Sequence, residues 1–139
     1  MIKSIEYRIG NALDLDQVIE LYRSCSLGGR RPVDDRDRVR AMLANANIVV
    51  TAWDGELMVG ISRAISDFSY ATYLSDLAVR ESYQRAGIGK ELIRRTQLAG
   101  GTQATVILLS APAAVDYYPR VGFERHDSCW LIRGDQPLR

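Results

Sequence analysis

Apolar residues gather in short stretches of the first half of the chain, bounded by polar turn residues, as is typical of β-strands. The clearest stretch runs from Ile48 to Trp53, is interrupted by Asp54-Gly55, and continues from Glu56 to Ala64. Because Asp-Gly readily adopts the positive backbone angles of a tight turn, this pattern predicts an antiparallel hairpin. Further strands are expected at Ile5 to Ile9 and at Tyr73 to Val79.

Short helices with apolar faces are expected before this hairpin. Asp14 and Asp35 are suited to cap their first turns, because a carboxylate accepts hydrogen bonds from the first backbone N–H groups of a helix. The apolar faces consist of Leu15, Val18, Ile19 and Tyr22 in the first helix, and Val39, Met42 and Leu43 in the second.

The second half predicts a unit of strand, helix and strand. A glycine-bearing turn, residues 84–89, opens a helix that is expected to end at Gly100-Gly101, and the β-branched run Thr105 to Ser110 predicts a central strand. Such crossovers are nearly always right-handed and join parallel strands. Pro112 is expected to start a short helix, and Phe123 to Ile132 to form one or two closing strands.

The composition is that of one globular domain covering residues 1–139, since 47% of the residues are hydrophobic and 25% are charged. The formal net charge is only +1, whereas a protein that neutralises nucleic-acid phosphates normally has a clear basic excess. No apolar stretch approaches the ~20 residues of a membrane-spanning helix, and Met1 to Gly10 lacks the apolar core of a secretory signal. We therefore expect a cytoplasmic protein with no nucleic-acid and no membrane partner.

The cysteines and the histidine do not form a metal or disulfide pattern. Cys25 and Cys129 lie far apart, without a CxxC or a flanking histidine cluster, so neither a disulfide framework nor a metal site is expected. Cys129 is expected to be a small buried residue. His126, the single histidine, is expected at the surface or in a strand.

The segment from Val79 to Leu92, VRESYQRAGIGKEL, places Gln84, Gly87 and Gly89 between a strand and the first turn of a helix. That turn offers backbone N–H groups without intrahelical partners, and glycines allow a pyrophosphate to approach this backbone closely. Glycines at a helix start also serve as plain turn residues, so the context decides between the two interpretations.

Two wider motifs supply that context. The spacing matches neither GxxxxGKS/T nor a GxGxxG after the first strand, but Gln84 to Gly89 matches Q/R-x-x-G-x-G/A. Downstream, Ala114 to Phe123 has the sequence AVDYYPRVGF, in which Tyr118 begins a Tyr-x-x-x-Gly-Phe pattern. These motifs resemble the coenzyme A pyrophosphate loop and the tyrosine helix of the GNAT superfamily of N-acetyltransferases. The order of the expected elements is similar to that family along essentially the whole chain.

The resemblance implies an α/β (α+β) acyltransferase fold, with a mixed, mostly antiparallel central sheet whose parallel strands splay apart and are flanked by helices. It also implies acetyl-CoA as a co-substrate and no metal. The positions that match the family's coenzyme site are Leu77, Ala78 and Val79 in the strand, Gln84, Arg85, Ala86, Gly87, Ile88, Gly89 and Lys90 in the loop, and Tyr118 beside the sulfur. A plain buried strand is the other interpretation of residues 77–79.

The resemblance gives Tyr118 the role of general acid. A phenol with an ordinary pKa of about 10 stays protonated at neutral pH and can donate to a departing thiolate. The other interpretation is a packed aromatic residue, as Tyr117 is expected to be. Pro119 departs from the acidic residue that is commoner at this position in the family, but it leaves the phenol in place.

Asp76 is the first candidate to accept the proton of the attacking amine. Its strand is expected to end at the thioester, and a carboxylate in a partly desolvated cleft has a raised pKa. Glu81 and Asp67 are weaker candidates for the same role. The other interpretation pairs Asp76 with an arginine and passes the amine proton through ordered water.

The resemblance thus implies an acetyl-CoA-dependent N-acetyltransferase that transfers the acetyl group directly to a primary amine. A narrower likeness of Gly60 to Leu92 to the plastid serotonin acetyltransferases and their bacterial relatives favours a small-molecule amine. The alternatives are a non-catalytic acyl-CoA sensor and a protein N-terminal or lysine acetyltransferase. Leu27 to Asp37 and Ser66 to Ala71 are expected to select the acceptor, and edge strands to form a homodimer.

Overall fold

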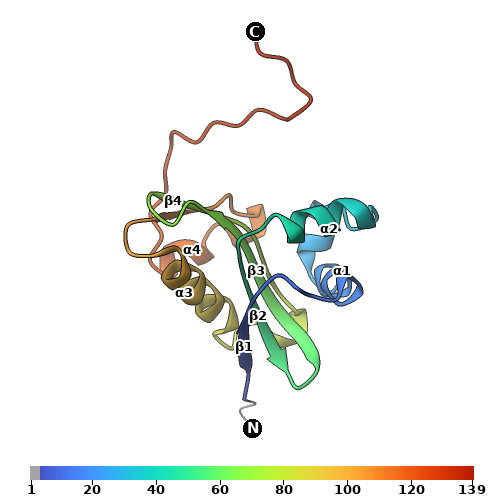
Figure 1. The fold of residues 1–139 in the computed structure, drawn as a ribbon. Helices are drawn as coiled ribbons and strands as arrows, with labels where there is room; N and C mark the ends of the chain where they lie inside the picture. Colours follow the sequence, from blue (N-terminus) through green and yellow to red (C-terminus); the bar gives the residue numbers. More distant parts are fainter. Residues whose placement is uncertain (1–3) are drawn as a thin grey trace. The chain divides into compact units, whose positions relative to one another are not determined.

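The computed structural model describes residues 4–139, which divide into two compact units, residues up to 109 and residues 110–139. Each unit is described by itself (Figure 1). The first unit holds every strand of the described chain and its three longest helices, and the second holds a short helix and an extended tail.

The first unit is built on a five-stranded sheet in the order β1-β2-β3-β4-β5. Its strands are β1 (Glu6–Ile9), β2 (Ile48–Asp54), β3 (Leu57–Ser66), β4 (Ala71–Val79) and β5 (Thr105–Ile107). Neighbours from β1 to β4 are antiparallel, and β5 is parallel to β4. The predicted hairpin is confirmed, with Gly55 at φ +61 in its turn. The mixed, mostly antiparallel sheet confirms the expected fold class.

Three helices flank this sheet: α1 (Leu15–Arg23), α2 (Arg36–Ala44) and α3 (Ile88–Gly100). Both predicted caps are confirmed, because the Asp14 carboxylate accepts from the N–H of Asp16 and that of Asp35 from the N–H of Arg38. A short 3-10 helix, η1 (Ser26–Arg30), follows α1. No helix among residues 4–139 is both long and apolar enough to cross a membrane.

The helices cover opposite faces of the sheet (Figure 1). Apolar residues of α1 and α2 form one buried cluster with Val49, Met58 and Ile61 of the sheet. On the other face, a Cβ at Gly60 of β3 would lie 3.0 Å from Leu92 Cδ1 of α3. The absence of a side chain at Gly60 therefore lets the start of α3 pack directly on the sheet.

A β-bulge changes the direction of side chains along β4. The β3–β4 register pairs Ala64 with Leu74 and then Arg63 with Asp76, so Ser75 is an extra residue. Residues four apart in an unbroken strand share a face. Thr72, however, lies against α3, because a Cβ placed at Gly100 of α3 would be 2.5 Å from Thr72 Oγ1. Asp76, four residues later, contacts α1. The bulge thus turns Asp76 toward α1.

Several expectations for the C-terminal part are wrong. β5 has only three residues and lies at the sheet edge, where a longer central strand was expected. Residues 123–132 form no strand among the described residues, and Trp130 is 90% exposed. Cys129 is exposed, not buried. An apolar stretch does not by itself make a strand, because the backbone also needs a neighbouring strand to pair with.

Candidate functional site

The predicted glycine loop connects β4 to α3 and is fixed at several points. The 3-10 helix η2 (Glu81–Tyr83) begins it. The side-chain amide of Gln84 donates to the carbonyl of Val79, the last residue of β4, over 2.9 Å. The Tyr83 hydroxyl donates to the carboxylate of Asp54 in the β2–β3 hairpin. The loop is therefore held against the end of the strand that precedes it.

Arg80 fastens the beginning of this loop to α1. Its guanidinium donates to both carboxylate oxygens of Glu20, over 2.7 and 2.6 Å, and to the carbonyl of Met58 over 3.0 Å. The backbone N–H of Arg80 donates to the carbonyl of Val59 over 2.8 Å. The ion pair with Glu20 lowers the pKa of that carboxyl, so the pair stays charged at neutral pH.

The N-terminus of α3 has the features of an anion site. Gly87 is the N-cap at φ +83, a left-handed conformation that favours glycine, and no side chain caps the helix. The first intrahelical bond runs from Glu91 N to Gly87 O over 3.1 Å, so the N–H groups of Ile88, Gly89 and Lys90 precede it. A Cβ at Gly87 would have no atom within 4 Å. The position that a side chain at Gly87 would occupy is therefore open.

The end of β4 carries the three predicted backbone positions. Leu77, Ala78 and Val79 pair with β3 on one side. On the other side, the β4–β5 ladder includes only Ala71 to Tyr73, while β4 continues for six residues, to Val79. Among the residues that the structure describes, this edge of residues 74–79 therefore belongs to no ladder. Backbone groups along such an edge suit hydrogen bonds to an extended ligand that carries amide groups.

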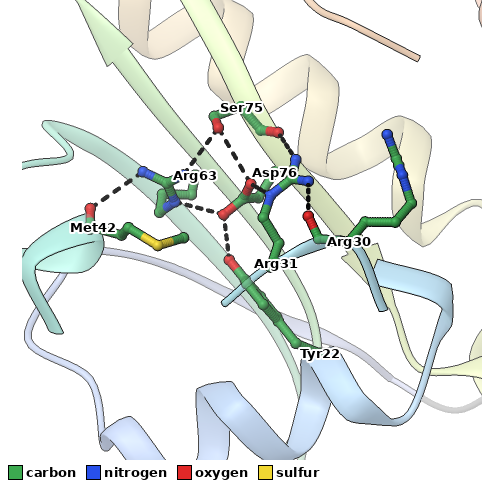
Figure 2. Close-up of polar contacts among 7 residues, drawn as sticks. All are labelled: Tyr22, Arg30, Arg31, Met42, Arg63, Ser75 and Asp76. Atoms are coloured by element: carbon green, nitrogen blue, oxygen red, sulfur yellow. Dashed lines mark hydrogen bonds and ion pairs between the residues drawn. The ribbon is translucent and has the colours of Figure 1, made fainter. Parts of the chain in front are cut away.

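Asp76 lies at the centre of a buried polar cluster made of Tyr22, Arg31, Arg63, Ser75 and Asp76, here named the Asp76 cluster (Figure 2). The Asp76 side chain is fully buried. Its Oδ2 accepts from Arg63 Nε over 2.6 Å and from the Tyr22 hydroxyl over 2.7 Å, and its Oδ1 accepts from Arg31 Nε over 2.6 Å. These contacts join α1, the segment after it, β3 and β4.

The pKa of Asp76 is lowered, so the expectation of a raised pKa is wrong. Burial alone would raise the pKa of this carboxyl, but the hydrogen bond and the charge of Arg63, with further bonds from Tyr22 and Arg31, outweigh it. Burial and the neighbouring carboxylate raise the pKa of Tyr22 well above its ordinary value, which keeps this hydroxyl a donor. The geometry is that of the other interpretation, a carboxylate paired with arginine.

Tyr118 belongs to the second unit, on the short helix α4 (Tyr117–Arg120), which follows η3 (Pro112–Ala114). Its carbonyl accepts from the backbone N–H of Phe123 over 3.0 Å, and Gly122 has φ +107 in the turn between them. The rings of Tyr118 and Phe123 meet edge to face with centroids 5.5 Å apart. The Tyr-x-x-x-Gly-Phe pattern thus forms a closed turn that orients the half-buried Tyr118 ring.

Residues 32–131 match the model of the acetyltransferase (GNAT) domain. This chain belongs to the GNAT acetyltransferase family. The family resemblance seen in the two sequence motifs is thereby confirmed.

Curated relatives of this GNAT domain have acetyltransferase names. It is 28% identical over 112 residues to an uncharacterized N-acetyltransferase, ycf52, of Pyropia yezoensis, a match that covers 75% of this chain and 63% of that protein. It is 27% identical over 137 residues to a probable acetyltransferase, TAP2, of Glycine max, covering 88% of this chain and 53% of that protein. The GNAT domain thus spans less than two-thirds of the length of these relatives.

Solved structures share the fold. A GNAT-family acetyltransferase of Streptococcus pneumoniae is 24% identical with a TM-score of 0.72, covering 94% of this chain and 99% of that one. A probable acetyltransferase of Staphylococcus aureus is 20% identical with a TM-score of 0.78, covering 94% and 99%. The aminoglycoside N-acetyltransferase AAC(6')-Iy in complex with CoA is 18% identical with a TM-score of 0.74, covering 98% of both chains.

The other two carboxylate candidates have different surroundings in this GNAT domain. Glu81 is exposed in η2. Asp67 organises the β3–β4 turn, since its Oδ1 accepts from the backbone N–H groups of Tyr70, Ala71 and Ser69, and these bonds lower its pKa. The partners of Asp76, namely Tyr22, Arg31 and Arg63, are absent from the sequence-based prediction. The available signal for Arg63 is its place inside the predicted hairpin, as a charged residue within an otherwise mostly apolar strand; the structure places this strand beside that of Asp76.

Proposed function

We propose that this GNAT domain transfers the acetyl group of acetyl-CoA directly to a primary amine of a small molecule. The observation that carries the proposal is the connection between two features of the first unit. The open edge of β4 ends at Val79, and the carbonyl of Val79 is bonded to Gln84, three residues before the N-cap Gly87 of α3. The pantetheine arm of acetyl-CoA carries amide groups, which suit the strand edge. The pyrophosphate of acetyl-CoA suits the helix N-terminus.

Acetyl-CoA supplies the acetyl group in the activated form of a thioester. In this proposal, the backbone of Leu77, Ala78 and Val79 holds the arm, and a backbone N–H near Ala78 polarises the thioester carbonyl. Residues 84–90 hold the pyrophosphate, and the exposed side chains of Arg85 and Lys90 add positive charge beside it.

The proposed reaction moves two protons. The amine nitrogen bonds to the carbonyl carbon of the thioester, the carbon–sulfur bond breaks, and the sulfur takes the proton of the Tyr118 hydroxyl, which later regains one from water. The amine releases its own proton to water. We do not assign this proton to Asp76, because two guanidiniums engage its carboxylate and its pKa is lowered.

A small-molecule amine is the acceptor that the comparisons support best. The structural neighbour AAC(6')-Iy is named an aminoglycoside N-acetyltransferase and is in complex with CoA. Another structure of the same neighbour holds a bisubstrate analogue that joins CoA to an acetylneamine. A small-molecule amine beside coenzyme A is therefore compatible with this fold.

The test is steady-state kinetics of Tyr118→Phe on a panel of small amines and lysine-containing peptides, with Tyr117→Phe as the matched control. Loss of a general acid lowers turnover by about 10²–10⁴-fold. We expect Tyr118→Phe to lower kcat in this range with acetyl-CoA affinity unchanged, and Tyr117→Phe to keep most of the turnover. Full turnover of Tyr118→Phe across pH would contradict the assignment. Activity on peptides alone would contradict a small-molecule acceptor and indicate a protein acetyltransferase. Binding of acetyl-CoA without turnover of any amine would indicate a sensor.

A further inference from the structure

The segment between α1 and α2, residues 24–35 and here named the α1–α2 segment, is fastened to β4 by the side chain of Arg31. We propose that Arg31 is a positioning residue that sets the acceptor side of the site by holding this segment against β4. The inference rests on the proposed function, because it concerns the acceptor of the same reaction.

Arg31 spans from the α1–α2 segment to the bulge of β4 (Figure 2). Its Nε donates to Asp76 Oδ1 over 2.6 Å, and its Nη2 donates to the carbonyl of Ser75 over 2.7 Å. A third bond, from Nη1 to the carbonyl of Arg30 over 2.8 Å, closes the segment on itself. Ser75 is the extra residue of the bulge and precedes Leu77 by two positions, so Arg31 holds the segment close to the proposed thioester site.

Other hydrogen bonds of the segment are local. Gly28 N donates to Cys25 O over 3.3 Å, and Val33 N to Arg31 O over 2.8 Å. Arg23 at the end of α1 donates to Asp34 over 2.6 Å, but both side chains are more than half exposed. Arg31, in contrast, contacts residues 44 and 45 positions away. Its bonds therefore connect the segment to the sheet.

The core of the Asp76 cluster does not depend on Arg31. Without it, Asp76 keeps the bonds from Arg63 Nε and from the Tyr22 hydroxyl. The Arg31 side chain is 20% exposed, whereas that of Arg63 is 7% exposed. Asp76 thus pairs with two guanidiniums, and the more exposed one, that of Arg31, belongs to the α1–α2 segment. Loss of Arg31 is expected to loosen the segment while the sheet and the coenzyme loop stay in place.

The test compares Arg31→Met with Arg30→Met in the full chain. The Arg30 side chain extends away from the cluster, and only the carbonyl of Arg30 enters it (Figure 2). Arg30→Met therefore removes the same charge from the same segment without removing the bonds to β4. Arg31→Lys is the conservative variant, since a lysine keeps the charge but has one ammonium group for two acceptors. Hydrogen exchange of residues 24–35, acetyl-CoA affinity and the KM of the acceptor amine are measured for each protein.

In Arg31→Met we expect amide exchange in the α1–α2 segment to be about tenfold faster, with exchange in α3 unchanged. The KM of the amine should rise about tenfold while acetyl-CoA affinity stays within about twofold of the wild type. Arg30→Met should match the wild type in amide exchange of residues 24–35, and Arg31→Lys should lie between Arg31→Met and the wild type. This pattern separates positioning of the segment from general destabilisation.

The inference is overturned if Arg31→Met and Arg30→Met show the same exchange in residues 24–35, or if exchange rises and the KM of the amine does not. A failure of the proposed function is visible separately, because the wild-type protein then turns over no amine. In that case hydrogen exchange still decides whether Arg31 holds the segment. Unchanged exchange overturns that claim, and faster exchange confined to the segment supports it.

Discussion

Arg63 and Asp76 face each other across the β3–β4 ladder, and their side chains form an ion pair of 2.6 Å that is almost fully buried. The guanidinium makes further bonds to the carbonyl of Met42 in α2 and to the Ser75 hydroxyl. A carboxylate held in this way cannot move toward a substrate without leaving a buried guanidinium unpaired. The pair therefore acts on the site by fixing the bulge of β4.

The first prediction concerns this pair. Asp76→Asn leaves Arg63 and Arg31 facing a neutral amide, and removal of one partner from a buried ion pair costs about 3–5 kcal/mol. We expect a loss of this size in the free energy of unfolding, measured with urea, or failure to fold. Asp34→Asn removes an exposed carboxylate that pairs with Arg23 and should change stability by less than about 1 kcal/mol. An Asp76→Asn protein that keeps wild-type stability and loses only turnover would instead indicate a general base.

A second prediction concerns Glu91 in the first turn of α3. Its bonds to Arg94 and Arg95 lower its pKa from 4.5 to about 2, the hydrogen bond from Arg94 being the largest cause. Because the pKa of the folded state is the lower one, the stabilisation is complete above pH 4.5 and is lost as the pH falls toward 2.

Glu91→Gln should therefore reduce the free energy of unfolding at pH 7 by less than about 1 kcal/mol, since water screens these ion pairs. The difference from the wild type should shrink steadily as the pH is lowered below 4.5. Glu56→Gln, in the exposed hairpin turn, serves as the control. Urea unfolding at several pH values measures both variants. A stability difference that grows toward low pH would contradict a lowered pKa of Glu91 in the folded state.

A third prediction tests how the start of α3 is placed. In Gly60→Ala the new Cβ would lie 3.0 Å from Leu92 Cδ1 and 3.2 Å from Ile88 Cγ2, so these two side chains of α3 must give way slightly. Overpacking of this kind costs about 1–3 kcal/mol.

We expect Gly60→Ala to lower both the unfolding free energy and the affinity for acetyl-CoA, because the side chains that give way belong to the first turns of α3, which carry the proposed pyrophosphate site. The matched control is Gly29→Ala in η1, where a Cβ meets no atom within 4 Å. Urea unfolding and calorimetric titration measure the two effects. Equal behaviour of the two alanine variants would contradict the close packing at Gly60.

Local signals in the sequence predicted most of the first unit. Asp14 and Asp35 cap their helices and Asp54-Gly55 forms its turn, because each of these features depends on a few neighbouring residues. The Asp76 cluster was not predictable in this way. Its geometry depends on the Ser75 bulge, which turns Asp76 to a face that alternation alone does not give, and on Arg31, which is 45 residues away.

In the C-terminal part, the sequence predicts strand structure that the described residues do not form. Residues 123–132 are predicted to form one or two closing strands, but the structure pairs this stretch with no described neighbour. Strand pairing depends on which edges are available, and a single stretch of sequence does not contain that information. The Tyr118 turn, in contrast, is local and was recognised from its Tyr-x-x-x-Gly-Phe spacing.

Calorimetric titration of the protein with acetyl-CoA tests the central claim most directly. Gly89→Trp puts a bulky side chain in the first turn of α3, whereas Gly134→Trp places the same side chain in the exposed tail. We predict micromolar binding to the wild type and to Gly134→Trp, and loss of binding in Gly89→Trp. No binding to the wild type at millimolar acetyl-CoA, or equal binding to Gly89→Trp, would contradict the assignment of the β4–α3 loop as the coenzyme site.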